Sequence, residues 1–316
     1  MSISDRFRDA QNGSRVAIAQ LLSVIERGGP ESRALGALAF PLTGGAHTVG
    51  ITGAPGAGKS TLTSSLLEVI RSKNVSPAVL AIDPSSPFTG GAILGDRVRM
   101  QAHATDPEVF IRSMASRGHL GGLSLATPQA VRFLDAIGKR VVIIETVGVG
   151  QVEVDIAGAA DTTVVVVNPG WGDGVQANKA GLMEIADIFV INKADRSGVE
   201  ETQRDLLQML ELSSLKNHVG WTPPIVATVG PSGQGVPALW VAITAHREHL
   251  VSTGLGAVRR ETRLRDEVRS IVLHALMARV DARLDTDFAR DAIADVVNRQ
   301  LDPWSAADSL LVDARE

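Results

Sequence analysis

The feature that most constrains the fold of this chain is the stretch at residues 53–60, which reads G-A-P-G-A-G-K-S. It matches the G-x-x-x-x-G-K-S phosphate-binding loop and lies between a short apolar run at residues 49–52 and a segment of helical character. The glycines let successive backbone N–H groups point at phosphate oxygens, and the following helix adds the positive end of its dipole. The sequence therefore predicts a strand, a loop and a helix that together bind a nucleotide.

The side chains that end this loop have distinct expected roles. We expect Lys59 to reach the β- and γ-phosphates, Ser60 to hold Mg²⁺ through its hydroxyl, and Thr61 to lie toward the α-phosphate. The alternative is a glycine-rich turn with an incidental lysine. The residues predicted to bind the nucleotide here are Gly53, Ala54, Pro55, Gly56, Ala57, Gly58, Lys59, Ser60 and Thr61.

Length and composition indicate an ordinary globular protein of 316 residues, large enough for one α/β domain with extra terminal helices. A formal net charge of −4 gives no electrostatic reason to expect nucleic acid as a partner. The absence of cysteine excludes disulfides and thiolate metal sites, and it fits a reducing compartment, so a cytoplasmic location is expected. The N-terminus has no apolar core of signal-peptide length, so secretion is not expected, and no later segment approaches the ~20 apolar residues that span a bilayer, so no membrane partner is expected.

Apolar, β-branched runs alternate with helical segments along the chain. Strands are expected at residues 49–52, 78–83, 109–112, 141–145, 162–168, 188–192 and 225–229. Such runs are typical of strands buried on both faces, which predicts an α/β fold with a mostly parallel sheet and ligands at the carboxyl ends of its strands.

Three parts of the chain are expected. Residues 1–43 form an N-terminal helical extension with two helices that separate near Gly28, residues 44–255 form the nucleotide-binding domain, and residues 256–316 form a C-terminal helical extension. In the last part, a helix over 258–284 places apolar side chains on one stripe, which either folds back on the sheet or forms a subunit or partner interface. The members of the stripe are Val268, Ile271, Val272, Ala275, Leu276 and Val280.

The tetrapeptide N-K-A-D at residues 192–195 follows the strand at 188–192 and indicates the base that is bound. The Asp195 carboxylate can accept from guanine N1–H and the N2 amino group together, whereas adenine offers neither donor there. Losing such bonds should disfavour ATP by at least ~10²-fold, so GTP is expected, with Asn192, Lys193 and Asp195 as binding residues. The alternative is that Asp195 only caps the next helix.

Three acidic residues are candidates for metal binding and hydrolysis. Glu145 ends a predicted strand, where its carboxylate can hold Mg²⁺ directly or through water, and Gly148 follows with an N–H for the γ-phosphate. Asp83 is placed to position the attacking water, and Asp96 to bind Mg²⁺. The alternatives are a helix cap for Glu145 and turn formation for the two aspartates.

The glycine-rich loop at residues 168–179 ends at Lys179 and is expected to be a third mobile element beside the site. The alternative is an ordinary loop in which Asp173 caps a helix. His246 and His249 have helical spacing but no third ligand nearby, so a structural or surface role is expected for them.

Together these motifs resemble one family. The loop at 53–61, A-I-D-P-S-S at 81–86, L-G-D-R at 94–97, E-T-V-G-V-G-Q at 145–151 and N-K-A-D at 192–195 are similar to those of MeaB-type GTPases, the G-protein chaperones of adenosylcobalamin-dependent methylmalonyl-CoA mutase. The resemblance covers roughly residues 45–250 and implies membership of the metallochaperone and signal-recognition branch of P-loop GTPases.

The resemblance also implies site residues, partners and an assembly. It assigns Mg²⁺ and hydrolysis roles to Ser60, Asp83, Asp96 and Glu145, and it assigns to Lys179 the switch that couples hydrolysis to the mutase. It implies GTP or GDP and Mg²⁺ as bound species, a homodimer formed through the C-terminal helices, and a mutase whose cobalamin loading is gated and which is protected or reactivated.

Two departures from the family pattern limit the transfer. The guanine-side S-A motif appears here as T-V-G-P at 228–231, so only backbone contacts from Val229, Gly230 and Pro231 are expected. Gly174 stands in the loop at residues 168–179 where the family resemblance implies an acidic or polar residue. This departure concerns the coupling to a partner and not nucleotide binding.

Three other functions compete with the chaperone interpretation. One is a P-loop kinase or transport-linked ATPase, which has no use for Asn192 and Asp195. Another is a nickel-inserting chaperone, which the lack of cysteine and the scattered histidines oppose. The last is a nucleotide-binding module without catalysis.

Overall fold

A computed structural model describes residues 1–83, 103, 105–115, 125–146, 152–170, 181, 183–214 and 220–312. The chain divides into two compact units, Met1–Arg263 and Leu264–Glu316. The division into 1–43, 44–255 and 256–316 by role stays a prediction. No helix in the described ranges is long and apolar enough to cross a bilayer.

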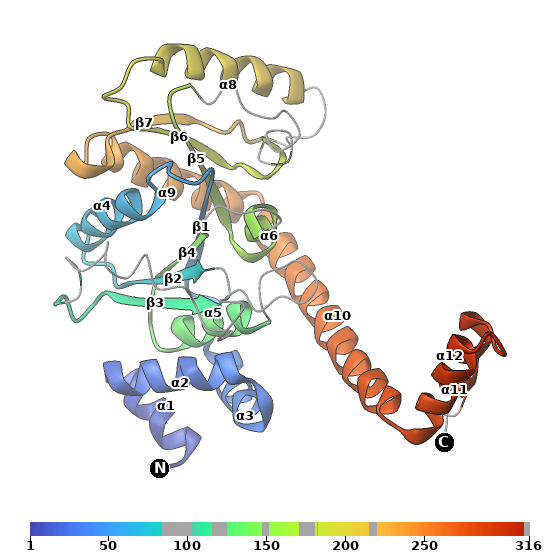
Figure 1. Ribbon diagram of the computed structural model, residues 1–316. Helices are drawn as coiled ribbons and strands as arrows, with labels where there is room; N and C mark the ends of the chain where they lie inside the picture. The colour runs from blue at the N-terminus through green and yellow to red at the C-terminus, as the bar shows by residue number, and fades with distance from the viewer. Residues whose placement is uncertain are drawn as a thin grey trace. The chain divides into compact units, whose positions relative to one another are not determined.

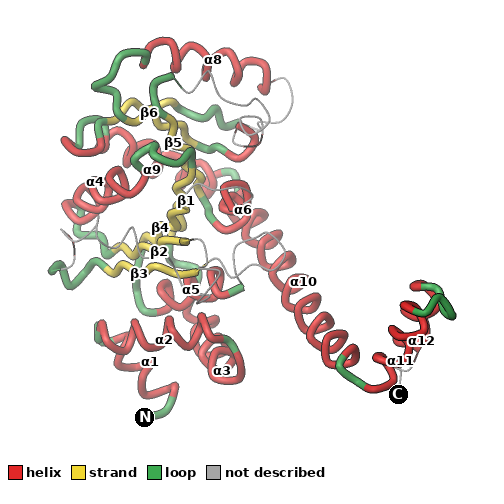
Figure 2. The backbone as a smooth tube through the Cα atoms, viewed as in Figure 1, coloured by secondary structure: helices red, strands yellow, loops and turns green. Residues whose placement is uncertain are grey.

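The first unit is built around a seven-stranded sheet in the order β3-β2-β4-β1-β5-β6-β7, in which every neighbouring pair is parallel (Figures 1 and 2). The predicted α/β fold is therefore confirmed. The strand order reverses at β1, which lies between β4 and β5, and ligands bind beyond the carboxyl ends of strands at such a point. The strands are β1 (His47–Thr52), β2 (Pro77–Asp83), β3 (Phe110–Ala115), β4 (Val141–Thr146), β5 (Thr162–Val167), β6 (Ile188–Asn192) and β7 (Ile225–Thr228).

The five inner strands are buried along their whole length, which explains why they appear in the sequence as continuous apolar runs. Successive residues point to opposite faces, so Val79 joins one core cluster and Leu80 the other. The helices that cover the sheet are α4 (Lys59–Ser72), α5 (Ala126–Ala136), α6 (Val152–Ala159), α8 (Val199–Ser214) and α9 (Val236–Ser252).

The N-terminal segment forms three helices rather than the predicted two: α1 (Ile3–Gln11), α2 (Arg15–Arg27) and α3 (Gly29–Ala39). The expected break at Gly28 is present, but a second break separates α1 from α2. There Gly13 has a φ of +88°, and the Ser14 side chain accepts a hydrogen bond from the Ala17 N–H and caps α2. Phe7 and Leu21 belong to the same buried cluster as Leu80 of β2, so these helices share the core of the sheet.

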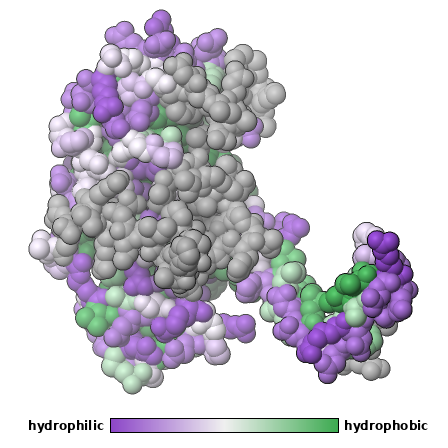
Figure 3. All heavy atoms as spheres, in the orientation of Figure 1, coloured by the Kyte–Doolittle hydropathy of each residue, from purple (hydrophilic) through white to green (hydrophobic). Residues whose placement is uncertain are grey.

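The second unit contains most of α10 (Leu255–Leu284), with α11 (Asp287–Val297) and α12 (Pro303–Val312). No residue of α10 is buried. The stripe predicted from the sequence is solvent-exposed, from 40 % at Val280 to 60 % at Val268. Apolar side chains gather visibly on this unit (Figure 3).

Candidate functional site

The phosphate-binding loop connects the carboxyl end of β1 to the first turn of α4, which begins at Lys59 as expected. Gly53, Gly56 and Gly58 all have positive φ values, of +132°, +76° and +86°. A Cβ on Gly53 would lie 2.0 Å from the carbonyl oxygen of Val166 in β5. The loop therefore leaves the sheet in direct backbone contact with the neighbouring strand, which only glycine permits.

Lys59 and Ser60 are both buried at the base of this loop. The Lys59 ammonium donates to the carbonyl oxygens of Gly53, at 2.6 Å, and Ala54, at 3.1 Å. The Ser60 hydroxyl donates to Glu145 Oε1 at 2.6 Å. The fold thus joins the loop to the carboxylate near the end of β4, although 85 positions separate the two residues.

Asp83 and Glu145 come from adjacent strands of the same sheet edge. Ala81 of β2 pairs with Glu145 of β4, so Asp83 lies two residues further toward the carboxyl edge. Both carboxylates are buried, with 2 % and 1 % of their residue surfaces exposed. Glu145 accepts from the Ser60 hydroxyl and Asp83 lies on the adjacent strand at the same edge, and such oxygen donors are of the kind that Mg²⁺ prefers.

Asn192, at the end of β6, forms hydrogen bonds with the phosphate-binding loop. Its side-chain amide donates to the carbonyl oxygen of Ala57 at 2.8 Å. Its amide oxygen accepts from the Thr228 hydroxyl and from the Gly230 N–H, both at 3.1 Å. A single buried side chain therefore ties the loop to the segment after β7, where Val229 leads into the short 3-10 helix η4 (Gly230–Ser232).

Lys193 follows in a left-handed conformation with a φ of +59°, which a lysine adopts only where its surroundings enforce it. Its ammonium donates to the carbonyl oxygen of Gly56 at 2.6 Å. Asp195 is exposed two residues later. The Gly230 carbonyl oxygen also accepts from the Ser65 hydroxyl at 2.6 Å, which joins η4 to α4.

The structure thus brings together the predicted residues of the phosphate-binding loop with Asp83, Glu145, Asn192 and Lys193. Asp96, Gly148, Gly174 and Lys179 lie outside the described residues. Thr228 was predicted to contribute no side-chain contact to the nucleotide, and its hydroxyl instead supports Asn192.

A pair of buried threonines was not foreseen either. The Thr146 hydroxyl donates to Thr52 Oγ1 at 3.1 Å and links β4 to the start of the phosphate-binding loop. A threonine near the end of a buried strand carries no local signal, because β-branched residues are common throughout strands.

Comparison with known proteins decides the family. The model of the methylmalonyl-CoA mutase-associated GTPase MeaB matches residues 18–285. The chain belongs to the MeaB GTPase family.

Relatives of this MeaB-family chain support the assignment. It is 51 % identical over 310 residues to a provisionally named GTPase of Pyrococcus horikoshii, covering 98 % of this chain and 97 % of that protein. It is 34 % identical over 314 residues to the GTPase ArgK of Escherichia coli, covering 96 % and 93 %. The mouse mitochondrial methylmalonic aciduria type A homolog is 34 % identical over 225 residues, covering 70 % and 53 %.

A solved structure described as an LAO/AO transport system kinase has the same fold. The TM-score is 0.71 at 25 % identity, with 99 % of this chain and 98 % of that chain covered. Together with the named relatives, this makes the chain a P-loop GTPase that binds GTP and GDP.

Proposed function

We propose that this GTPase gates the loading of the cobalamin cofactor into an adenosylcobalamin-dependent methylmalonyl-CoA mutase and protects or reactivates that enzyme. The observation that carries the proposal is the family match, since the matched family is described as mutase-associated and covers residues 18–285. A relative named for methylmalonic aciduria adds support. Hydrolysis then acts as a timing signal, with GDP and phosphate as its only small-molecule products.

In this proposal the loop at residues 53–61 binds the phosphates through its backbone N–H groups. Lys59 exchanges its two loop carbonyl partners for phosphate oxygens, which are stronger acceptors because they are charged. Asn192 holds the loop in shape for this exchange through its bond to Ala57. The nucleotide therefore meets a loop that is already positioned.

Ser60, Asp83 and Glu145 fit Mg²⁺, because a hydroxyl and two buried carboxylates offer the oxygen donors that this ion requires. We assign Asp96 to the same ion. Bound Mg²⁺ would neutralise charge on the β- and γ-phosphate oxygens.

The remaining catalytic roles rest on the places of Asp83 and Gly148 in the sequence and, for Lys179, on the family resemblance. We assign Asp83 to the positioning of the attacking water, the Gly148 N–H to the γ-phosphate, and Lys179 to the coupling of hydrolysis to the mutase. Of these residues the structure describes Asp83, which lies at the carboxyl edge of the sheet, where a P-loop GTPase holds its nucleotide.

The base is recognised from the segments after β6 and β7. Asp195 accepts from guanine N1–H and N2, and backbone groups of Val229, Gly230 and Pro231 line the other side. The exposure of Asp195 in the chain leaves its carboxylate accessible to a base. The second bond that Gly230 makes, to Ser65 on α4, supports the position of this backbone.

We also propose that two copies of the chain pair through α10. The stripe from Val268 to Val280 exposes about half of each large apolar side chain, and contiguous apolar surface of this kind marks interaction sites. Sedimentation equilibrium of the full chain should give the mass of two copies, and a single-copy mass would contradict the pairing.

Cofactor transfer into the mutase is the direct test of the gating role. Apo-mutase is mixed with adenosylcobalamin and this chain in the presence of GTP, GDP or a non-hydrolysable GTP analogue, and holo-mutase is followed by its visible absorbance. We expect the rate of transfer to depend on which nucleotide is bound, because the conformation of a GTPase responds to the presence of the γ-phosphate. Identical rates with all three nucleotides, and with no chain added, would refute gating.

A second candidate is a P-loop kinase or transport-linked ATPase. The solved structure described as an LAO/AO transport system kinase favours it. Such an activity needs ATP and a second substrate, and it gives no role to Asp195, so nucleotide preference separates the two proposals.

A further inference from the structure

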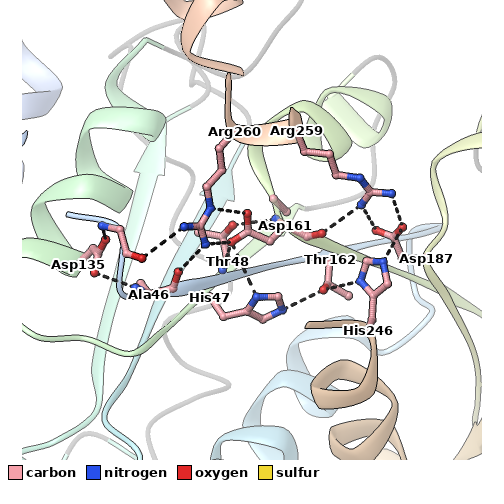
Figure 4. A network of polar contacts seen from close by, with 12 residues as sticks. Ala46, His47, Thr48, Asp135, Asp161, Thr162, Asp187, His246, Arg259 and Arg260 are labelled. Carbon is pink, nitrogen blue, oxygen red and sulfur yellow. Dashed lines mark hydrogen bonds and ion pairs between the residues drawn. The ribbon is translucent and has the colours of Figure 1, made fainter. Parts of the chain in front are cut away.

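Three arginines in the first turns of α10 contact the edge of the sheet opposite to the phosphate-binding loop, and two of them, Arg259 and Arg260, are shown in Figure 4. Arg259 forms a two-pronged contact with Asp187, at 3.1 and 3.3 Å. Arg260 donates to Asp161 at 3.3 Å and to the carbonyl oxygens of Gly44 and Ala46. Arg263 pairs with Asp161 and with the carbonyl oxygen of Ala160.

These ion pairs attach a part of α10 in which no residue is fully buried and Leu255 is a partly buried apolar side chain. Two apolar residues in the first turn, Ala257 and Val258, are exposed, Val258 by 60 %. A helix held by hydrogen-bonded charges rather than by apolar burial is sensitive to the charge of the surface beneath it.

The two aspartates are fixed at the starts of strands. Asp161 accepts from the Thr48 N–H at 3.0 Å, and Asp187 accepts from the Thr163 N–H at 2.8 Å. Burial raises the pKa of Asp161, but Arg263, the Thr48 N–H and Arg260 outweigh it and hold that pKa well below its usual range. Asp161 therefore stays ionised.

Beneath the arginines, two histidines meet at one threonine hydroxyl. His47 Nε2 lies 2.9 Å from Thr162 Oγ1, and His246 Nδ1 lies 2.8 Å from the same oxygen. Their other ring nitrogens face the aspartates, at 3.8 Å from Asp161 for His47 and 3.3 Å from Asp187 for His246. Both imidazoles are buried, with 3 % and 0 % of their surfaces exposed.

The hydrogen bonds among His47, Thr162 and His246 are compatible with two neutral imidazoles. Thr162 has one hydroxyl hydrogen, so it donates to one histidine and accepts from the other. His246 Nε2 lies 3.3 Å from the Asp187 carboxylate without meeting hydrogen-bond geometry, and a proton belongs on this nitrogen because a bare lone pair would face a negative charge. His246 Nδ1 then accepts from Thr162, and His47 Nε2 donates to it. These tautomers are inferred from the charge of Asp187 and from the two contacts to Thr162.

The surrounding charges disfavour any further proton. Burial lowers the pKa of His47 to about 4 against the attraction of Asp161, and Arg247, His246 and Arg260 add to the decrease. Burial likewise lowers the pKa of His246 to about 4, although Asp187 and Asp161 act to raise it. Arg259 and His249 lower this pKa further. An imidazolium here would compete with the arginines for the same two carboxylates.

We propose that these groups form a proton-sensitive latch, made of Arg259, Arg260, Arg263, Asp161, Asp187, His47, Thr162 and His246. With both imidazoles neutral, the latch holds the first turns of α10 against the sheet. A proton added to either imidazole repels the adjacent arginine and releases this part of the helix. The latch is independent of the proposed mutase partner and uses no residue of the nucleotide site.

The direction of the pH effect follows from the two states. In the latched state the pKa of each imidazole lies near 4. In the released state that pKa is higher, because Arg259 and Arg260 no longer neutralise Asp187 and Asp161, so acidification favours release. Between these values, each imidazole favours release by up to about tenfold per pH unit, and both together by up to about a hundredfold. Above the pKa of the released state the latch is insensitive to pH.

Hydrogen exchange of the full chain tests the latch. Exchange of the amides at residues 255–263 is measured from pH 7.5 to pH 5 and corrected for the intrinsic pH dependence. We expect these amides to exchange more than tenfold faster at pH 5, while amides of β5 and β6 do not change. The double variant His47→Asn with His246→Asn should lose most of this dependence, whereas His274→Gln, at an exposed site on α10, should retain it.

A second variant tests whether the latch holds the first turns of α10 if the double histidine variant fails to fold. This triple variant replaces Arg259, Arg260 and Arg263 with glutamine and so changes only the helix side of the latch. We expect its amides at residues 255–263 to exchange fast already at pH 7.5, with no further increase at pH 5. Arg269→Gln, further along α10, is the matched control. The proposal is overturned by pH-independent exchange at 255–263 in the unmodified chain, by exchange that rises together with β5 and β6, or by a triple variant that exchanges as slowly as the control.

Discussion

Replacing Asp195 with asparagine is expected to lower the affinity for GTP by at least about a hundredfold. The carboxylate accepts from two donors on guanine, and each hydrogen bond to a charged group contributes about 1.5–3 kcal/mol. The asparagine amide nitrogen would face the guanine amino group donor to donor. Since ATP presents no such donors, its weak binding should hardly change. Titration of the purified variant with fluorescent GTP and ATP analogues measures both effects.

Xanthosine triphosphate provides a sharp control for this prediction. Xanthine carries a carbonyl where guanine carries the N2 amino group. The asparagine amide of Asp195→Asn can donate to this carbonyl while its oxygen accepts from N1–H. The variant should therefore prefer xanthosine triphosphate to GTP. Glu200→Gln, an exposed carboxylate on the neighbouring helix α8, is the matched substitution and should leave all affinities unchanged. Equal losses of GTP and ATP binding in Asp195→Asn would show that Asp195 does not read the base.

The second large effect is expected from Gly53→Ala. The new Cβ would lie 2.0 Å from the Val166 carbonyl oxygen, and the φ of +132° is a conformation that alanine avoids. Either β5 or the start of the phosphate-binding loop must move, and backbone cannot rotate away as a long side chain can. We expect the free energy of unfolding to fall by about 2–4 kcal/mol and GTP binding to fall more than tenfold. Urea denaturation without nucleotide measures the first effect.

Gly56→Ala separates steric contact from backbone strain. Gly56 also has a positive φ, of +76°, but a Cβ there meets nothing within 4 Å in the described residues. Its cost in unfolding free energy should therefore be limited to the left-handed conformation, about 1–2 kcal/mol. If the two variants were equally stable, the close approach of Gly53 to Val166 would not be what requires glycine.

The fold could be predicted from sequence where burial is simple. The inner strands are covered on both faces, so each appears as an unbroken apolar run, and all seven predicted runs correspond to strands. The break between α1 and α2 was missed because Gly13 and Ser14 were not recognised as a turn and a helix cap. The apolar stripe of α10 was recognised, but periodicity does not say what covers a helix.

The candidate site was predictable to the extent that its residues form local motifs. The phosphate-binding loop and the Asn192 segment have fixed spacings at strand ends, and the structure places them together. The latch has no such pattern. His47 and Thr162 are 115 positions apart, and Thr162 and His246 are 84 positions apart. The parallel sheet, together with α9, which carries His246, brings them into contact.

The measurement that tests the central claim most directly is steady-state phosphate release from GTP and from ATP, each with and without a methylmalonyl-CoA mutase from the same source. Lys59→Ala serves as the inactive control, because it removes the ammonium expected to reach the β- and γ-phosphates. The account predicts that the mutase changes GTP turnover alone and that ATP turnover stays at the level of the control. Turnover of ATP at the same rate as GTP, or a rate of GTP turnover that is unchanged by the mutase, would contradict the claim that the chain is a guanine-selective chaperone of that enzyme.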